Sequence, residues 1–130
     1  MLSRRDVFLG ATVLAVAAAA SPASAFTFQP YDPASVQKAI AAGKKVVVHV
    51  YAPWCLQCRT QASILSGLEA DHTYDNVAFF RVDYDNQGDI VKALGVPRST
   101  LIGYKGGHET GRMSWGMSTQ SVLDVLKTVV

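Results

Sequence analysis

The chain has 130 residues, of which 12 are Lys or Arg and 10 are Asp or Glu, giving a formal net charge of +2. This near balance, with no basic stretch in which aromatic residues are interleaved, argues against a nucleic acid as a partner. The two cysteines form a single pair, and His49, His72 and His108 are not arranged as a second pair, which argues against a structural zinc site with its usual four protein ligands. The length is that of one small domain preceded by a short leader.

The first 25 residues have the pattern of a secretory signal peptide. Arg4 and Arg5 form a basic start, residues 7–20 are almost wholly apolar, and Ala-Ser-Ala at 23–25 supplies the small residues of a cleavage site. We therefore expect residues 1–25 to be removed. A retained membrane anchor is the alternative, although the apolar stretch is short for a membrane span.

The leader also indicates where the mature chain goes. Residues 3–9, Ser-Arg-Arg-Asp-Val-Phe-Leu, resemble a twin-arginine export signal, and an ordinary secretory signal is the alternative. Either route predicts a periplasmic protein, residues 26–130, with no stable membrane insertion after cleavage. In that oxidising compartment a cysteine pair stays reduced only if a donor supplies electrons.

Helix and strand patterns alternate along the rest of the chain. Asp32 suits an N-cap and Pro33 a first helical position, so a helix is expected from there to Gly43. Residues 45–51 are β-branched and apolar on both faces, which is typical of a buried parallel strand. The further expected elements are a helix from Cys55 to about Ala70, a strand over 77–82, a helix from Asn86 or Gln87 to Leu94 ended by Gly95, a hairpin of strands 100–104 and 109–115 around Lys105-Gly106-Gly107, and a last helix capped by Ser118.

This order predicts an α/β fold in which a mixed central sheet of about four strands is covered by helices on both faces. In such sheets the active groups lie outside the carboxyl ends of the strands. The end of the strand over 45–51 is followed directly by the two cysteines. Trp115, near the end of the hairpin, is expected to pack in the core.

Cys55 and Cys58 are the only cysteines, and they open a helix immediately after a strand. At a helix N-terminus, free amide groups and the helix dipole stabilise a thiolate and lower the thiol pKa. The second sulfur lies three residues on, on the same helix face, where it can close a disulfide and release a partner. A purely structural disulfide is the other interpretation, but so short a loop gains little stability from closure.

The run Ala52-Pro53-Trp54-Cys55-x-x-Cys58, with Asp-Tyr-Asp at 83–85, Thr-Leu-Ile at 100–102 before a Gly-Gly turn, and Gly116, resembles the thioredoxin family. The resemblance covers essentially all of residues 26–130 and implies a thioredoxin-like domain. It also implies that Cys55 is the nucleophile and Cys58 the resolving thiol. Trp54 would then pack beside the site and Pro53 would shape its loop. The resemblance makes both of them candidate substrate-binding residues.

The sequence departs from the family pattern six residues before Cys55. The family has a buried aspartate there, which is thought to accept the proton of the resolving thiol, and this chain has His49. One hypothesis makes a neutral His49 imidazole the proton acceptor. The other makes it a hydrogen-bonded core residue without a catalytic part.

A second departure lies before the strand that faces the cysteines. The family places a cis-proline there, and this chain has Ser99, with Pro97 two residues upstream. Either Pro97 takes the role in a shifted register or the cis bond is absent. Because a cis bond before a residue other than proline costs about 2.5–4 kcal/mol, Ser99 is expected to be trans. Since the family pairs this backbone with its substrate, Ser99 is a candidate substrate-binding residue.

The resulting hypothesis is a periplasmic thiol:disulfide oxidoreductase that reduces disulfides of exported proteins. It needs no cofactor; its partners would be protein disulfides or dithiols and a membrane or periplasmic thiol donor, and the protein is expected to be a monomer. A reducing direction is favoured because the family's oxidases often have histidine where this chain has Gln57, and carry a helical insertion for which there is no room.

The alternative hypothesis uses the same sulfurs to bind a metal. Without a proline beside them, Cys55 and Cys58, with His49 or Ser99, form a candidate soft site for Cu(I) or Zn. A metal chaperone would keep both thiolates unoxidised, whereas a redox protein would cycle through the disulfide.

Overall fold

The computed structural model describes residues 26–130, and the predicted signal peptide, residues 1–25, lies outside them. Five strands, four α-helices and a short 3₁₀ helix follow one another in the described residues. Their bounds are β1 (Phe28–Pro30), α1 (Pro33–Ala41), β2 (Lys45–Tyr51), α2 (Leu56–Gly67), the 3₁₀ helix (His72–Tyr74), β3 (Val77–Asp83), α3 (Gly88–Leu94), β4 (Thr100–Lys105), β5 (His108–Ser114) and α4 (Thr119–Leu126).

The strands form one mixed sheet in the order β1-β3-β2-β4-β5. The central strand β2 runs parallel to β3 and antiparallel to β4, and β4 and β5 form the predicted hairpin. The sheet has one strand more than predicted, because β1 pairs in parallel with β3 at the edge. With three residues, one of them a proline that lacks a backbone donor, β1 carries almost no strand pattern.

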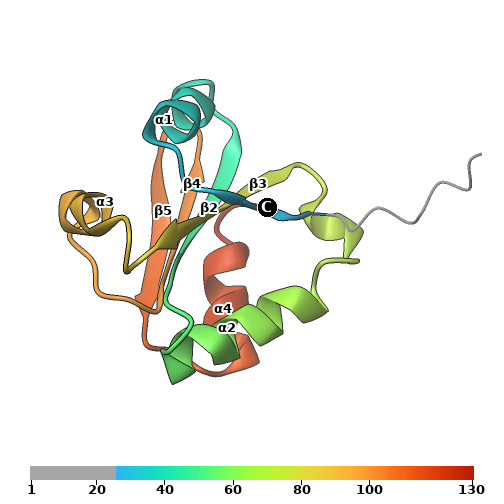
Figure 1. Cartoon of the computed structure of the whole chain (residues 1–130). Coiled ribbons are helices and arrows are strands. Elements are labelled where there is room, and N and C mark those ends of the chain that lie inside the picture. Colours follow the sequence, from blue (N-terminus) through green and yellow to red (C-terminus); the bar gives the residue numbers. More distant parts are fainter. Residues whose placement is uncertain (1–25) are drawn as a thin grey trace, which may run out of the picture.

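Helices cover both faces of the sheet, as predicted: α2 and α4 lie on one side, and α1 and α3 on the other (Figure 1). Alternate residues of β2 serve the two cores. Val46, Val48 and Val50 pack toward α1 and α3, whereas Val47 packs toward α2 and α4. Because β2 is packed on both faces, the position of the loop that follows Tyr51, which leads to the cysteines, is fixed.

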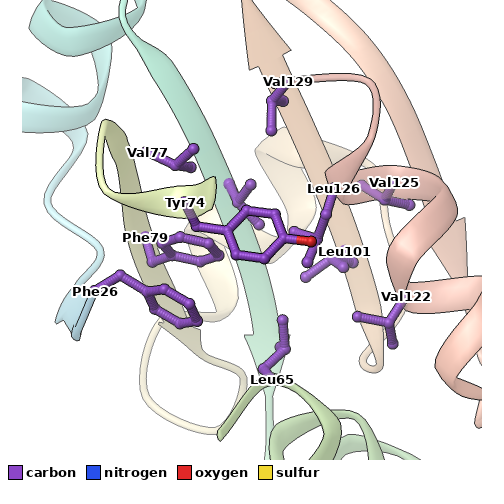
Figure 2. Close-up of a cluster of buried hydrophobic side chains, with 11 residues drawn as sticks. Phe26, Leu65, Tyr74, Val77, Phe79, Leu101, Val122, Val125, Leu126 and Val129 are labelled. Atoms are coloured by element: carbon purple, nitrogen blue, oxygen red, sulfur yellow. The ribbon is translucent and has the colours of Figure 1, made fainter. Parts of the chain in front are cut away.

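The core under α2 and α4 is shown in Figure 2. The ring of Phe26 stacks on Phe79 with centroids 3.8 Å apart, and the edge of Tyr74 meets Phe26 at 6.2 Å. Leu65 of α2 and residues of α4 close this cluster from the helical side. The cluster anchors α2, the helix that begins at the cysteines.

Local signals explain most element boundaries. The side chains of Asp32 and Ser118 cap α1 and α4, as predicted, and Gly95 ends α3 in the left-handed conformation. Helix α2 is shorter than predicted: it ends at Gly67, and Leu68 begins a turn. Within residues 26–130, the helices are all too short or too polar to cross a membrane.

Candidate active site

The two cysteines lie where β2 gives way to α2. Cys55 is the N-cap of α2, and its Sγ accepts a hydrogen bond from the backbone N–H of Cys58 at 3.3 Å. Both are free thiols and both are buried, with 2% of Cys55 and none of Cys58 exposed. A sulfur as N-cap ligand takes the place that an Asp or Ser oxygen usually fills, and there the helix favours its anionic form.

The hydroxyl of Ser99 lies between the two sulfurs. Its Oγ is 3.1 Å from the Sγ of Cys55 and 2.9 Å from the Sγ of Cys58. Ser99 lies directly before β4 and donates its N–H to the carbonyl of Val50 at 3.0 Å, so Ser99, and not Pro97, faces the cysteines. No peptide bond in residues 26–130 is cis. With a φ of 59°, Ser99 has a left-handed backbone that side-chain-bearing residues rarely adopt.

The surroundings shift the pKa values of the two thiols in opposite directions. Burial pushes the pKa of Cys55 up, but hydrogen bonds from the Cys58 thiol, the Ser99 hydroxyl, the Cys58 amide and the Arg98 guanidinium outweigh it and lower the pKa to about 7. For Cys58, burial and its hydrogen bond to Cys55 raise the pKa, and the Ser99 hydroxyl only partly opposes them. The pair is therefore polarised: one acidic sulfur and one that keeps its proton.

His49 is fully buried and both of its ring nitrogens are engaged. Gln61 donates its amide to the carbonyls of Ser99 and Gly116, so its oxygen faces His49 and accepts from Nε2 at 3.0 Å. The other nitrogen, Nδ1, lies 3.4 Å from Nη2 of Arg81, which donates to it. This pattern requires the neutral ring, protonated on Nε2.

The charge near His49 opposes its protonation. Burial is the larger cause and the Arg81 guanidinium the smaller one, and together they lower the pKa of His49 to about 3. The hydrogen bond to Gln61 raises the pKa but does not outweigh them. Arg81 itself lies over the rings of Phe28 and Tyr51, with its guanidinium carbon 4.0 Å and 4.9 Å from their centroids. With its only lone pair facing a cation, His49 fits the core hypothesis better than the proton-acceptor hypothesis.

Gln61 is a functional residue that the sequence analysis missed. It joins His49 to Ser99, at hydrogen-bond distances of 3.0 Å for both contacts. The signal was present: Gln61 lies one helical turn from Cys58 and from Leu65, on the buried face of α2. A buried polar residue on that face needs hydrogen-bond partners, and two of those partners, His49 and Ser99, are the residues that depart from the family pattern.

The exposed rim of the site is aromatic and cationic. Trp54 is 55% exposed and donates its indole N–H to both oxygens of Asp85, at 2.9 Å and 3.0 Å. Trp115 is 42% exposed, so the expectation of a core residue was wrong. The backbone N–H of Trp115 donates to the carbonyl of Ser99. The backbone of Trp115 is left-handed, with a φ of 69°, and its exposed indole lies beside Arg98. Pro53 lines an adjacent open cleft of about 470 Å³.

The comparison with known families is decisive. A sequence model of the family named Thioredoxin matches residues 28–128. The chain belongs to the thioredoxin family. Thioredoxin-2 of Saccharomyces cerevisiae is 36% identical to it over 77 residues, which are 58% of this chain and 72% of the relative. The thioredoxin of Alicyclobacillus acidocaldarius is 33% identical over 75 residues, 57% of this chain and 70% of the relative.

Solved structures agree. Trxlp from Edwardsiella tarda superposes with a TM-score of 0.70 at 33% identity, over 75% of this chain and 96% of that one. The reduced Schistosoma mansoni thioredoxin pre-protein gives 0.63 at 28% identity, over 80% and 95%. The predicted thioredoxin-like fold is confirmed, and the chain is a thioredoxin-like thiol oxidoreductase whose Cys-x-x-Cys pair is Cys55 and Cys58.

Within residues 26–130, no His, Asp or Glu side chain joins the two thiols that the metal-binding alternative would use. In the described part of the chain, no three His, Cys, Asp or Glu side chains are grouped so as to hold an ion. His49 directs Nε2 to Gln61 and Nδ1 to Arg81 rather than to the sulfurs. The remaining donors are two thiols and the hydroxyl of Ser99, which is a poor ligand for soft metals.

Proposed function

We propose that Cys55 is the nucleophile of this oxidoreductase and that Cys58 is the resolving thiol. The observation that carries the assignment is the opposite shift of the two pKa values, lowered to about 7 for Cys55 and raised for Cys58. The lowered pKa favours the thiolate of Cys55 near neutral pH, while Cys58 keeps its proton until the second step. The substrates are disulfides of proteins, on which the protein acts as a monomer.

The reaction has two steps. The thiolate of Cys55 attacks a substrate disulfide, forms a mixed disulfide and releases the first substrate sulfur, which takes a proton from solvent. The sulfur of Cys58 then attacks Cys55, the bond to the substrate breaks, and the second substrate sulfur leaves with the proton that Cys58 gives up. The substrate gains two electrons, and Cys55 and Cys58 lose them as they form a disulfide. A donor dithiol restores the thiols.

In the second step, Ser99 provides the path for the proton. Its Oγ is close enough to accept the S–H of Cys58, at 2.9 Å, and to donate its own O–H toward the sulfur of Cys55, at 3.1 Å. As Cys58 attacks, the hydroxyl takes its proton and passes one to the departing sulfur bonded to Cys55. Such a relay fills the part that His49, engaged by Gln61 and Arg81, is badly placed to play.

The direction of electron flow follows from how strongly the thiolate is stabilised. Strong oxidants of the family often carry a histidine just before the second cysteine, which stabilises the thiolate, and this chain has Gln57 there. A protein that stabilises its reduced form only modestly gives electrons up readily. We therefore assign this chain the reducing direction.

A periplasmic location is part of the proposal. The leader pattern of residues 1–25 supports export, and a reductant in that compartment requires a membrane or periplasmic thiol donor. Fractionation of cells that produce the full chain is expected to find a periplasmic protein beginning at Phe26. An uncleaved chain in the cytoplasm or the membrane contradicts this location.

The function and the proton path are tested together with Ser99→Ala. Wild-type protein is expected to turn over in the reduction of insulin disulfides by dithiothreitol. In Ser99→Ala we expect the second step to slow by about tenfold or more near neutral pH, with the mixed disulfide accumulating, because Cys58 loses its proton acceptor. Rapid acid quench and mass spectrometry measure that species.

The control is Thr100→Val, which removes a neighbouring hydroxyl that bonds to Pro97 and Ser114 and touches neither sulfur. Its second step is expected to keep the wild-type rate. If Ser99→Ala resolves as fast as wild type, the proton takes another path. If wild type reduces no disulfide at all, the proposed function fails.

A further inference from the structure

Arg98, the residue before Ser99, is held between two indole rings at the mouth of the site. Its guanidinium carbon lies 4.8 Å from the ring centroid of Trp54 and 4.9 Å from that of Trp115. Both indoles are about half exposed. Contact with two indole rings restrains the cation at this place.

This cation has no carboxylate partner in the part of the chain that the structure describes. The ion pairs found in residues 26–130 are His72 with Asp75 and Arg112 with Glu109, and the Nε of Arg98 is buried without a hydrogen-bond acceptor. The carboxylate beside Trp54, that of Asp85, is occupied with the indole N–H. A guanidinium presents five donors, so most of this binding capacity is unused.

Arg98 is also next to the sulfur that the substrate must reach. Its guanidinium contributes to the lowered pKa of Cys55, Ser99 next to it contacts both sulfurs, and Trp54 directly precedes Cys55 in the chain. Beside Cys55 the rim also carries Leu56, which is 62% exposed, and Gln57, whose Oε1 lies 3.6 Å from the Cys55 sulfur. A disulfide that approaches Cys55 therefore meets the positive charge of Arg98 between two half-exposed indole rings, and the Asp85 carboxylate of that rim already accepts the indole N–H of Trp54.

We propose that Arg98, clamped by Trp54 and Trp115, is a specificity site that binds a carboxylate of the substrate next to the disulfide attacked by Cys55. The inference rests on the proposed function and adds the class of substrate: a protein segment with an acidic residue beside its cysteine. The planar fork of Arg98 matches a carboxylate in two parallel hydrogen bonds, which a lysine does not reproduce. Because the rings already hold the cation in place, little side-chain freedom is lost on binding.

The test uses disulfide-bonded peptides that differ in one residue next to the cysteine: Glu, Gln or Lys. Each rate of reduction is divided by the rate with dithiothreitol alone, which removes the intrinsic reactivity of the disulfide. We expect wild type to prefer the Glu peptide over the Gln peptide by about threefold to fivefold in kcat/KM, and to disfavour the Lys peptide. The preference is expected to shrink as salt is raised.

Arg98→Met removes the charge and keeps the apolar stem, and it is expected to equalise the three peptides. Arg98→Lys keeps the charge and is expected to lose most of the Glu-over-Gln preference. A change in the reactivity of Cys55 alone lowers all three rates together and leaves their ratio unchanged. The matched control is Arg59→Met, which removes an exposed arginine of α2; it is expected to keep the wild-type ratio.

Two results overturn the inference: equal rates for the three peptides with wild type, or an unchanged Glu preference in Arg98→Met. Oxidised glutathione, a small disulfide with several carboxylates, forms a second arm. The rate with oxidised glutathione is compared with the rate with the neutral hydroxyethyl disulfide. If the preference for a carboxylate is seen with the peptides but not in this comparison, the site is assigned to polypeptides. A preference in both arms assigns it to carboxylates from either source. If the proposed function holds, every peptide and disulfide is still reduced, whichever one is preferred. A failure of the proposed function, which abolishes reduction altogether, is therefore distinguishable from a failure of this inference.

Discussion

Cys55→Ser is expected to bring disulfide reduction down to the rate without protein. The reaction begins with a thiolate, and a serine hydroxyl is neither ionised at neutral pH nor able to form a disulfide. The fold is expected to persist, because a serine oxygen is an ordinary N-cap ligand and can accept the N–H of Cys58, as the sulfur of Cys55 does. Insulin reduction and far-ultraviolet circular dichroism measure the two properties.

Cys58→Ser is the informative partner variant, because it removes only the second step. A mixed disulfide between Cys55 and a substrate protein is expected to form and to persist, since no second sulfur attacks it. Mass spectrometry identifies the trapped protein and the linked cysteine. Full activity in Cys55→Ser, or a mixed disulfide trapped through Cys58 in that variant, would contradict the assigned roles.

Gln61→Leu is expected to lower the free energy of unfolding by about 2–4 kcal/mol, because it leaves buried polar groups without partners. The N–H of His49 loses its acceptor, and the carbonyl of Gly116 loses its donor. The ring of His49 cannot switch tautomers to escape, because Arg81 donates to its other nitrogen. Equilibrium unfolding of the reduced protein in urea measures the loss.

The same variant is expected to disturb the reaction, since the Gln61 amide also holds the carbonyl of Ser99 at 3.0 Å. With Ser99 less constrained, its hydroxyl leaves the sulfurs more often and the pKa of Cys55 rises. Gln37→Leu, on the exposed face of α1, is the matched control and is expected to change neither property. Stability within about 1 kcal/mol of wild type in Gln61→Leu would contradict the role given to this network.

The two departures from the family pattern belong together. His49 and Ser99 lie 50 residues apart in the sequence and meet through one side chain, that of Gln61. Where the family places a buried carboxylate and a proline, this protein has a neutral imidazole and a serine, joined by the Gln61 amide, which donates to the Ser99 backbone carbonyl. The three groups hold one another in place, so each depends on the others.

Local chemistry explains what was predictable. The N-caps Asp32 and Ser118, the apolar run of β2 and the Gly-Gly turn of the hairpin each act within a few residues, so their elements were predicted within a few positions. The Cys-x-x-Cys motif was found for the same reason. Its position at the end of a central strand followed from the order of the elements.

What escaped prediction depends on contacts between distant segments. Strand β1 exists because β3 offers it an edge, not because three residues have strand character. Trp115 is a large aromatic residue of the kind expected in the core, yet its left-handed backbone directs the indole toward Arg98 at the surface. The engagement of His49 by both Gln61 and Arg81 likewise requires α2, β2 and β3 to be in place together.

The most direct test of the central claim is a redox titration of the wild-type protein against glutathione or dithiothreitol buffers, with the Cys55–Cys58 disulfide measured by mass spectrometry. We expect a single two-electron transition at a potential near thioredoxin's value of about −270 mV. A potential near about −120 mV would make the protein an oxidant. Failure to form the Cys55–Cys58 disulfide at any poise would contradict the dithiol mechanism itself.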